Sequence, residues 1–210
     1  MLYDLIFPEL RDKRWGYVNY GIEAEANPFQ NPNPLLNPAT CEAWKIRLHE
    51  KFGIDCSFGG WMEDRSSLWY GSYLLPGAAW HLGLDFTVPA GSMVHLPCSA
   101  VLHGAIHNPD QSFGWGGKAI FRLNDHFVIL AHIDLIGLVP GERYKQGDQI
   151  GTVAPSTSNG GWDPHLHLQI VGPGINPEIV DGYSALYEHV RLDFPDPAMF
   201  FDEKFDRREQ

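Results

Sequence analysis

Three segments of the sequence carry histidine and aspartate residues at spacings that could bind a metal ion. They are residues 81–85 (HLGLD), residues 130–132 (LAH) and residues 165–167 (HLH). Imidazole nitrogens and carboxylate oxygens are ligands that suit Zn²⁺. Two imidazoles and one carboxylate would leave the fourth tetrahedral position for water, and such an open site is typical of a catalytic zinc ion rather than of a structural one.

The third segment predicts a strand that presents two histidines on one face. Residues i and i+2 of a strand point the same way, so His165 and His167 would lie side by side. Leu166 and Leu168 would then face the core. One imidazole could bind a metal while the other acts on a substrate, or both could be ordinary hydrogen-bonded strand residues.

The other two segments offer further candidates. His81 and Asp85 stand four residues apart, where a glycine-containing stretch enters a strand. Asp85 could bind a metal, or it could accept hydrogen bonds from backbone amides at a strand end. His132 follows the apolar run 127–131 (FVILA) and would project at the rim of a sheet, either into the same site or as a hydrogen-bonded histidine.

Short alternating or apolar runs are expected to form the strands that position these residues. They recur from about residue 80, separated by Gly, Pro, Asn and Asp, at residues 83–88, 93–96, 118–123, 127–132, 149–153 and 165–171. This spacing predicts a mainly β fold (α+β with few short helices), as an antiparallel β sandwich or a partly closed barrel.

Helices are expected outside this β region. A helix that Thr40 caps and Gly53 ends would place four apolar residues on one face, namely Cys41, Trp44, Leu48 and Phe52. Residues 184–190 predict a second, short helix. The sequence Pro195-Asp196-Pro197 should end regular structure, and residues 202–210 should form a frayed charged tail.

Taken together, the three segments resemble the lysostaphin-type (LytM-like) zinc endopeptidases, a family of murein hydrolases. The family pattern is H-x-x-x-D, then a histidine that closes a later strand, then H-x-H. The neighbouring residues are similar too, at residues 81–91 (HLGLDFTVPAG), 146–151 (QGDQIG) and 164–168 (PHLHL). The resemblance covers roughly residues 78–173. Residues 130–131, the longer link 152–163 and the first 75 or so residues depart from the family pattern.

This resemblance implies an antiparallel β core with a groove, and it implies a role for each of the five residues. His81, Asp85 and His167 would be the zinc ligands, while His132 and His165 would assist catalysis. A zinc ion with an open position activates water at neutral pH. One of the two catalytic histidines would move the proton and the other would stabilise the developing negative charge, with the assignment left open. The family substrate is an amide bond in peptidoglycan peptides.

Four further residues are candidates for supporting roles. Asp134 and Asp163 could orient a ligand imidazole, although each could equally be a solvated surface carboxylate. Trp115 and Trp162 could line a substrate groove or could only cap a core.

The resemblance and the composition shifts divide the chain into three parts. We expect residues 1–75 to form an N-terminal extension with one helix, residues 76–176 to form a zinc peptidase-like β domain, and residues 177–210 to form a C-terminal extension packed on it. The extension at the N-terminus could occlude the groove as a latency device.

Composition restricts the partners. The chain has 15 basic and 26 acidic residues, a net charge of −11, which argues against a nucleic-acid or anionic-membrane partner. It has no C-x-x-C pair, and three cysteines fit reduced thiols, although a bridge between Cys41 and Cys56 is open. No secretory signal is evident, so a cytoplasmic location is expected by default even though the family substrate lies in the cell wall.

Two alternatives to a peptidoglycan endopeptidase therefore stay open. One is an intracellular zinc hydrolase of another peptide or amide. The other is a catalytically silent binding or regulatory module, against which the presence of all five motif residues argues. The oligomeric state and the scissile bond do not follow from the sequence.

Overall fold

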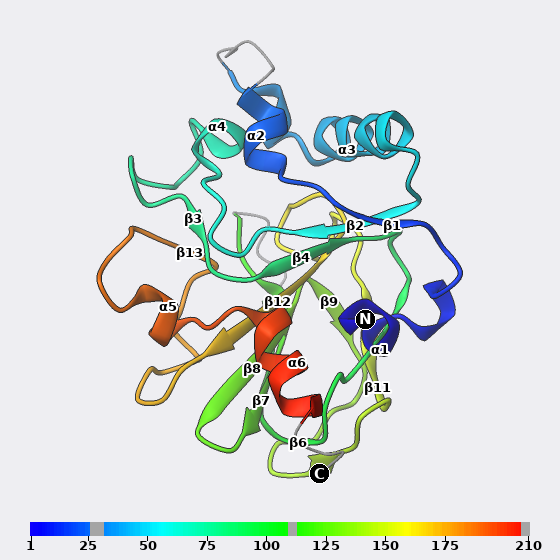
Figure 1. Ribbon diagram of the computed structural model, residues 1–210, viewed down its shortest axis with the longest axis vertical. Helices are drawn as coiled ribbons and strands as arrows, with labels where there is room; N and C mark the ends of the chain where they lie inside the picture. Colours follow the sequence, from blue (N-terminus) through cyan, green and yellow to red (C-terminus); the bar gives the residue numbers. More distant parts are fainter. Residues whose placement is uncertain (26–31, 109–112, 207–210) are drawn as a thin grey trace.

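The computed structural model describes residues 1–25, 32–108 and 113–206, and its main feature is a large open sheet (Figure 1). Eight strands lie in the order β1-β2-β4-β12-β8-β7-β6-β10. In that order their bounds are Trp15–Tyr17, Cys56–Gly59, Leu84–Thr87, Leu166–Val171, His126–Ala131, Gly116–Leu123, Ala100–Asn108 and Arg143–Tyr144. Neighbouring strands are antiparallel except β1 and β2, which are parallel.

Two small sheets accompany the large one. The first has the order β5-β11-β9, and the second pairs β13 with β3. Their bounds are Met93–His95, Gln149–Val153 and Ile133–Leu135 for the first, and Tyr183–Ser184 and Trp80–His81 for the second. The mainly β prediction is confirmed, but the barrel alternative is wrong, because β1 and β10 end the large sheet without pairing with each other in the described chain.

Strand β12 is the central element of the large sheet. All six of its residues are buried, and it pairs with β4 on one side and with β8 on the other. Leu166 and Leu168 face the main hydrophobic core, as the alternation predicts. This position explains why a strand with two polar side chains, His167 and Gln169, has both faces covered by the rest of the molecule.

One long strand escaped the sequence analysis. Strand β6 (Ala100–Asn108) runs for nine residues, yet five of them are exposed and Gly104 interrupts its apolar alternation at a register shift. A half-exposed strand with two histidines and a bulge has no clear period of two, so hydrophobic alternation could not reveal it.

The expected helix is α3 (Pro38–Phe52), with three differences in detail. Asn37 caps it by accepting a hydrogen bond from the Thr40 amide, because Pro38 already opens the first turn. Phe52 is 44% exposed, and Lys45 rather than Phe52 lies on the buried face. Gly53 ends the helix in the left-handed conformation, as predicted.

Residues 1–75 contain more regular structure than the single predicted helix. The additional α-helices are α1 (Leu2–Ile6), α2 (Tyr20–Glu25) and α4 (Ser66–Trp69), each too short to display a helical period in the sequence. Strands β1 and β2 of this region extend the large sheet beyond β4. The division of the chain at residue 75 stays a proposal, since the sheet runs across it.

The C-terminal predictions are largely wrong. No helix covers residues 184–190: Ser184 belongs to β13, and helix α5 spans Val190–Asp193. Pro197 begins helix α6 (Pro197–Asp206) instead of ending regular structure, because proline is favoured in a first helical turn. Helix α6 buries Phe200 and Phe201 against the core beside α1 (Figure 1). The last part of the predicted frayed tail, residues 207–210, lies outside the described residues.

The three cysteines, Cys41, Cys56 and Cys98, are buried and none of them is part of a disulfide, so the bridge left open between Cys41 and Cys56 does not form. Among the described helices, none combines the length and apolarity needed to cross a bilayer.

Candidate metal centre

The structure brings together the three residues expected to bind a metal. Asp85 on β4 and His167 on β12 are directly paired across the sheet, and His81 ends the neighbouring strand β3. His167 Nδ1 lies 3.0 Å from both Asp85 Oδ1 and His81 Nε2. His81 Nε2 lies 3.3 Å from Asp85 Oδ1. One ligand atom from each residue thus points at a common buried position.

These separations fit a zinc ion. Ligand atoms on a tetrahedron with bonds of about 2.0–2.1 Å to zinc lie about 3.3–3.4 Å apart. The observed distances of 3.0, 3.0 and 3.3 Å are close to that value. A small outward adjustment of the ligand atoms would therefore place all three on one ion and leave one tetrahedral corner open.

Gln169 fixes the orientation that His167 needs as a ligand. The amide nitrogen of Gln169 donates to the carbonyl of Asp181 at 3.3 Å, so its oxygen faces His167 Nε2 at 2.9 Å and accepts a hydrogen bond from the Nε2–H. Neutral His167 then has its lone pair on Nδ1, directed at the carboxylate oxygen of Asp85. Two lone pairs facing each other at 3.0 Å repel, and a cation between them removes that repulsion.

His132 and His165 lie beside these residues, and the backbone fixes both of their tautomers. The Nδ1–H of His132 donates to the carbonyl of Asn159 at 2.8 Å. The Nδ1–H of His165 donates to the carbonyl of Asp163 at 2.7 Å. Each neutral ring therefore keeps the lone pair of Nε2 for the site, and the ring centroids are 4.5 Å apart. Both histidines are placed to accept a proton at Nε2.

Backbone geometry helps to aim these side chains. His132 directly follows β8 and has a φ of 64°, in the left-handed region that non-glycine residues rarely occupy. At Gly83, an added Cβ would lie 2.7 Å from ring atoms of His167, so only glycine permits this close approach of β4's entry to the imidazole.

Burial favours the neutral form of three imidazoles of the site, those of His81, His132 and His165. It lowers the pKa of His81 to about 4, although Asp85 acts in the opposite direction. Burial, reinforced by the neighbouring His165 and His167, also holds the pKa of His132 well below its ordinary value. Burial lowers the pKa of His165 as well. Neutral imidazole is the form that can bind a metal or accept a proton, and burial favours this form for these three residues.

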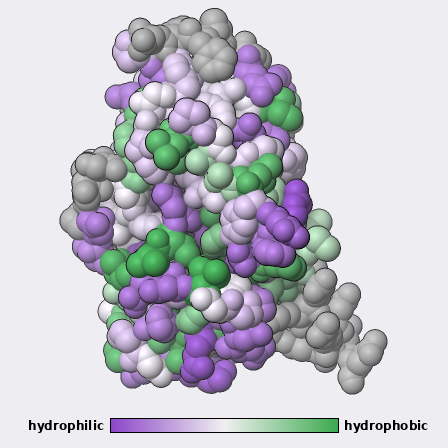
Figure 2. Space-filling view, turned by 90° about the vertical axis from the view of Figure 1, so that its left-hand side faces the viewer, coloured by the Kyte–Doolittle hydropathy of each residue, from purple (hydrophilic) through white to green (hydrophobic). Residues whose placement is uncertain are grey.

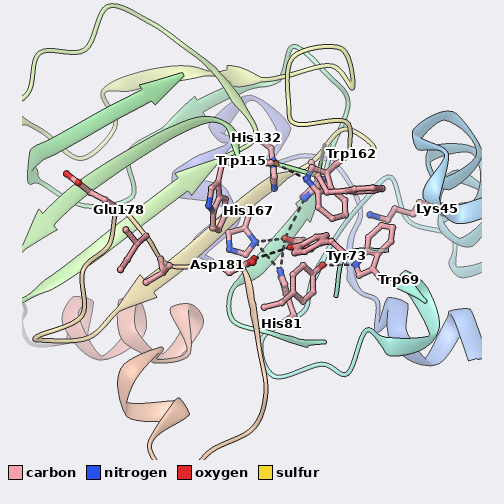
Figure 3. Close-up of a pocket in the computed structure, with 18 residues that line it drawn as sticks. Lys45, Trp69, Tyr73, His81, Trp115, His132, Trp162, His167, Glu178 and Asp181 are labelled. Carbon is pink, nitrogen blue, oxygen red and sulfur yellow. Dashed lines mark hydrogen bonds and ion pairs between the residues drawn. The ribbon is translucent and has the colours of Figure 1, made fainter. Parts of the chain in front are cut away.

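The five residues open onto a cavity of about 430 Å³ with a largely aromatic wall (Figure 3). Trp115 and Trp162 line it, as the sequence analysis allowed, together with Trp69, Tyr73 and Phe113. Glu178 lies at the end opposite Lys45, and Asp181 lies beside His167 (Figure 3). The molecular face on the side of β3 and β13 mixes small hydrophobic patches with hydrophilic side chains (Figure 2).

Residues 79–177 match the family model described as Peptidase family M23. The chain carries a peptidase family M23 domain. The match contains all five residues of the site, and it joins this domain to the lysostaphin-type family that the sequence pattern resembles. No curated protein sequence matches the chain significantly.

Several solved structures share part of the fold of this M23 domain. A structure of LytU is 22% identical, with a TM-score of 0.43, and the match covers 59% of this chain and 73% of that one. Lysostaphin from Staphylococcus simulans is 21% identical, with a TM-score of 0.44, and 59% of this chain and 45% of that chain are covered. A zinc-containing peptidase from Vibrio cholerae is 21% identical, with a TM-score of 0.38, and the match covers 45% of this chain and 28% of that one.

The sequence analysis missed or misjudged some residues around the site. Gln169 stands two residues after His167 on the same strand face, so the alternation that paired the histidines could have found it. Asp163 is 2% exposed and pairs with Lys45, so the surface alternative for it is wrong. Asp134 accepts a hydrogen bond from Ser158 rather than from a histidine of the site. No sequence signal points to the carbonyl of Asn159.

Proposed function

We propose that the chain is a zinc-dependent endopeptidase that hydrolyses amide bonds in peptidoglycan peptides. One observation carries the proposal: in a domain of a peptidase family, two imidazoles and a carboxylate converge within 4.8 Å of one another beside two further histidines with free Nε2 atoms. His81, Asp85 and His167 would hold the ion. Zinc bound there would supply Lewis-acid activation of water and of the scissile carbonyl.

The histidines of the chain would move the protons. His132 and His165 each have Nδ1–H anchored to a carbonyl, so only Nε2 can exchange a proton with the reacting groups. One of them would accept the proton of the attacking water at Nε2 and return it to the leaving amine. The other would stabilise the developing oxyanion in its imidazolium form, with a second proton on Nε2 that the approaching negative charge favours. The loss of either one should reduce kcat by about 10²–10⁴-fold.

The aromatic walls of the cavity would hold the peptide and keep bulk water from the reacting atoms. Trp69, Tyr73, Phe113, Trp115 and Trp162 offer flat apolar surfaces on the side of the proposed ion that faces the cavity. Such walls strengthen every electrostatic contact with the substrate because they lower the local dielectric constant.

Digestion of purified peptidoglycan by the zinc-loaded protein tests this function. We expect new free amino groups, with the cleaved bond identified by mass spectrometry of the released fragments. Chelation should stop the release, and His132→Asn and His165→Gln should stop it while zinc stays bound. Turnover that survives in both variants would disprove the assigned chemistry. Cleavage of small peptides but not of peptidoglycan would mean that the substrate is a peptide other than peptidoglycan.

A further inference from the structure

Residues 1–75, which precede the matched domain, place two buried cationic side chains beside the candidate metal centre. Lys45 comes from α3, and Arg65 stands at the start of α4. Their side chains are 2% and 0% exposed, respectively. Figure 3 shows Lys45 at the Trp69 and Trp162 end of the cavity. Buried cations are rare unless they are paired, so their partners indicate what they do.

Arg65 binds the carboxylate of Asp85 on the side away from the histidines. Its Nη1 lies 3.1 Å from Asp85 Oδ2, whereas Asp85 Oδ1 faces His81 and His167. Oδ2 of Asp85 therefore contacts Arg65, and Oδ1 is left for the proposed ion. The contact with Arg65 fixes the rotation of the carboxylate, so that one oxygen is presented to the ion.

Glu63 balances the charge of Arg65. Its Oε2 accepts a hydrogen bond from Arg65 Nε at 3.0 Å, and its Oε1 accepts one from the Tyr17 hydroxyl at 2.9 Å. Arg65 is thus shared between two carboxylates and does not neutralise Asp85 alone. Asp85 keeps enough negative charge to attract a cation.

Lys45 acts on the other half of the site. Its Nζ lies 2.7 Å from Asp163 Oδ2, and both side chains are at most 2% exposed. The backbone carbonyl of the same Asp163 accepts the Nδ1–H of His165 at 2.7 Å. The ion pair therefore anchors the residue that orients His165.

Stability alone does not account for these pairs. Apolar residues of similar volume often replace a buried ion pair with no loss of stability. Moreover, the partner of Arg65 is Asp85, a proposed zinc ligand, and the partner of Lys45 is Asp163, which binds a proposed catalytic histidine. We propose that residues 1–75 complete the catalytic centre, with Arg65 positioning Asp85 for zinc and Lys45 positioning His165 through Asp163. This inference rests on the proposed function.

The Arg65 half is tested by zinc affinity, measured by competition with a chelating dye. Arg65→Lys keeps the charge but cannot reach Glu63 and Asp85 together, so we expect zinc affinity to fall about 10–100-fold. Glu63→Gln is a second, nearly isosteric variant. It leaves Asp85 as the only anion beside Arg65 and should also weaken zinc binding.

The Lys45 half is tested by kinetics of the zinc-loaded protein. The double variant Lys45→Met with Asp163→Asn leaves no unpaired buried charge and should fold. We expect zinc affinity within threefold of wild type, KM within twofold and kcat reduced about 10–100-fold, because only the orientation of His165 changes. A purely structural role would lower the unfolding temperature without this split between kcat and KM.

Exposed ion pairs of the same region provide matched controls. Arg14→Met and Lys51→Met remove cations that are 67% and 57% exposed, and neither zinc affinity nor kcat should change. The Lys45 half would be overturned if the folded double variant kept wild-type zinc affinity and wild-type kcat. The Arg65 half would be overturned if folded Arg65→Lys or folded Glu63→Gln kept wild-type zinc affinity. A wild-type chain that binds no zinc would overturn the proposed function and this inference with it.

Discussion

Hydrogen bonds determine which ring nitrogen carries the proton in three histidines of this centre. Backbone carbonyls hold His132 and His165, and a side-chain amide holds His167, with the free nitrogen turned inward in each case. The sequence could predict four of the five residues because H-x-x-x-D and H-x-H are local patterns, and it pointed to His132 as the histidine that closes the apolar run 127–131. It could not predict the acceptors, because Asn159 and Asp163 reach the histidines only through backbone carbonyls placed by the fold.

The metal-free protein should lose stability as the pH falls below about 6.5. An unfolded histidine has a pKa near 6.5, whereas burial lowers the pKa of folded His81 to about 4. The unfolded state therefore binds more protons in this window, and His81 alone should cost on the order of 2 kcal/mol at pH 5. Denaturant unfolding in chelator at pH 8, 7, 6 and 5 measures the effect.

Above pH 7 these histidines should have no effect on stability, because both states are neutral. His132→Asn should flatten part of the decline between pH 7 and pH 5, since the pKa of His132 is also held low by burial. Stability that stays constant from pH 7 to pH 5 would show that the imidazoles are not kept neutral.

At the scale of elements, the pairing of β4 with β12 determines the site. Strand β12 and the assignment of its residues to the two faces of the sheet were accessible from the sequence, because its alternation is regular. The neighbours of β12 in the sheet were not, since pairing partners are chosen by long-range packing. Helix α3 shows the same division: its end at Gly53 follows from local chemistry, whereas Lys45 on its buried face depends on Asp163, which is distant in sequence.

Gly83→Ala should weaken zinc binding at least tenfold and lower the unfolding temperature. Its Cβ would lie 2.5 Å from the carbonyl of Leu168 and 2.7 Å from the ring of His167, so the imidazole or the strand must move. Gly104→Ala on β6 is the matched control, because its Cβ would meet nothing within 4 Å. Equal zinc affinity in both variants would mean that the strands tolerate the displacement.

At the scale of the whole molecule, the N-terminal region is continuous with the peptidase domain. The latency hypothesis from the sequence assumed a separable segment over the groove. In the structure, β2 pairs with β4, the strand that carries Asp85, and Phe7 packs in the same core as Phe86. Nothing in the sequence could show this, because the pairing joins regions outside and inside the family pattern.

Deletion of residues 1–75 should therefore abolish cooperative folding rather than release activity. The deletion exposes the edge of β4 and leaves Asp163 buried without Lys45, which is costly for a carboxylate. Thermal unfolding followed by circular dichroism, with the full chain as reference, measures the result. A folded and more active fragment would instead support a latency role.

The left-handed backbone at His132 has a consequence for engineering. A residue with a Cβ atom loses roughly 1–2 kcal/mol of stability in this conformation, and glycine avoids that cost. His132→Gly would relieve this strain but would also lose the hydrogen bond to the carbonyl of Asn159 and the ring contact with Trp115, so it should not melt at a higher temperature than the wild type, and it should hydrolyse nothing. The strained backbone is therefore held in place by the contacts of the very side chain that it aims at the site.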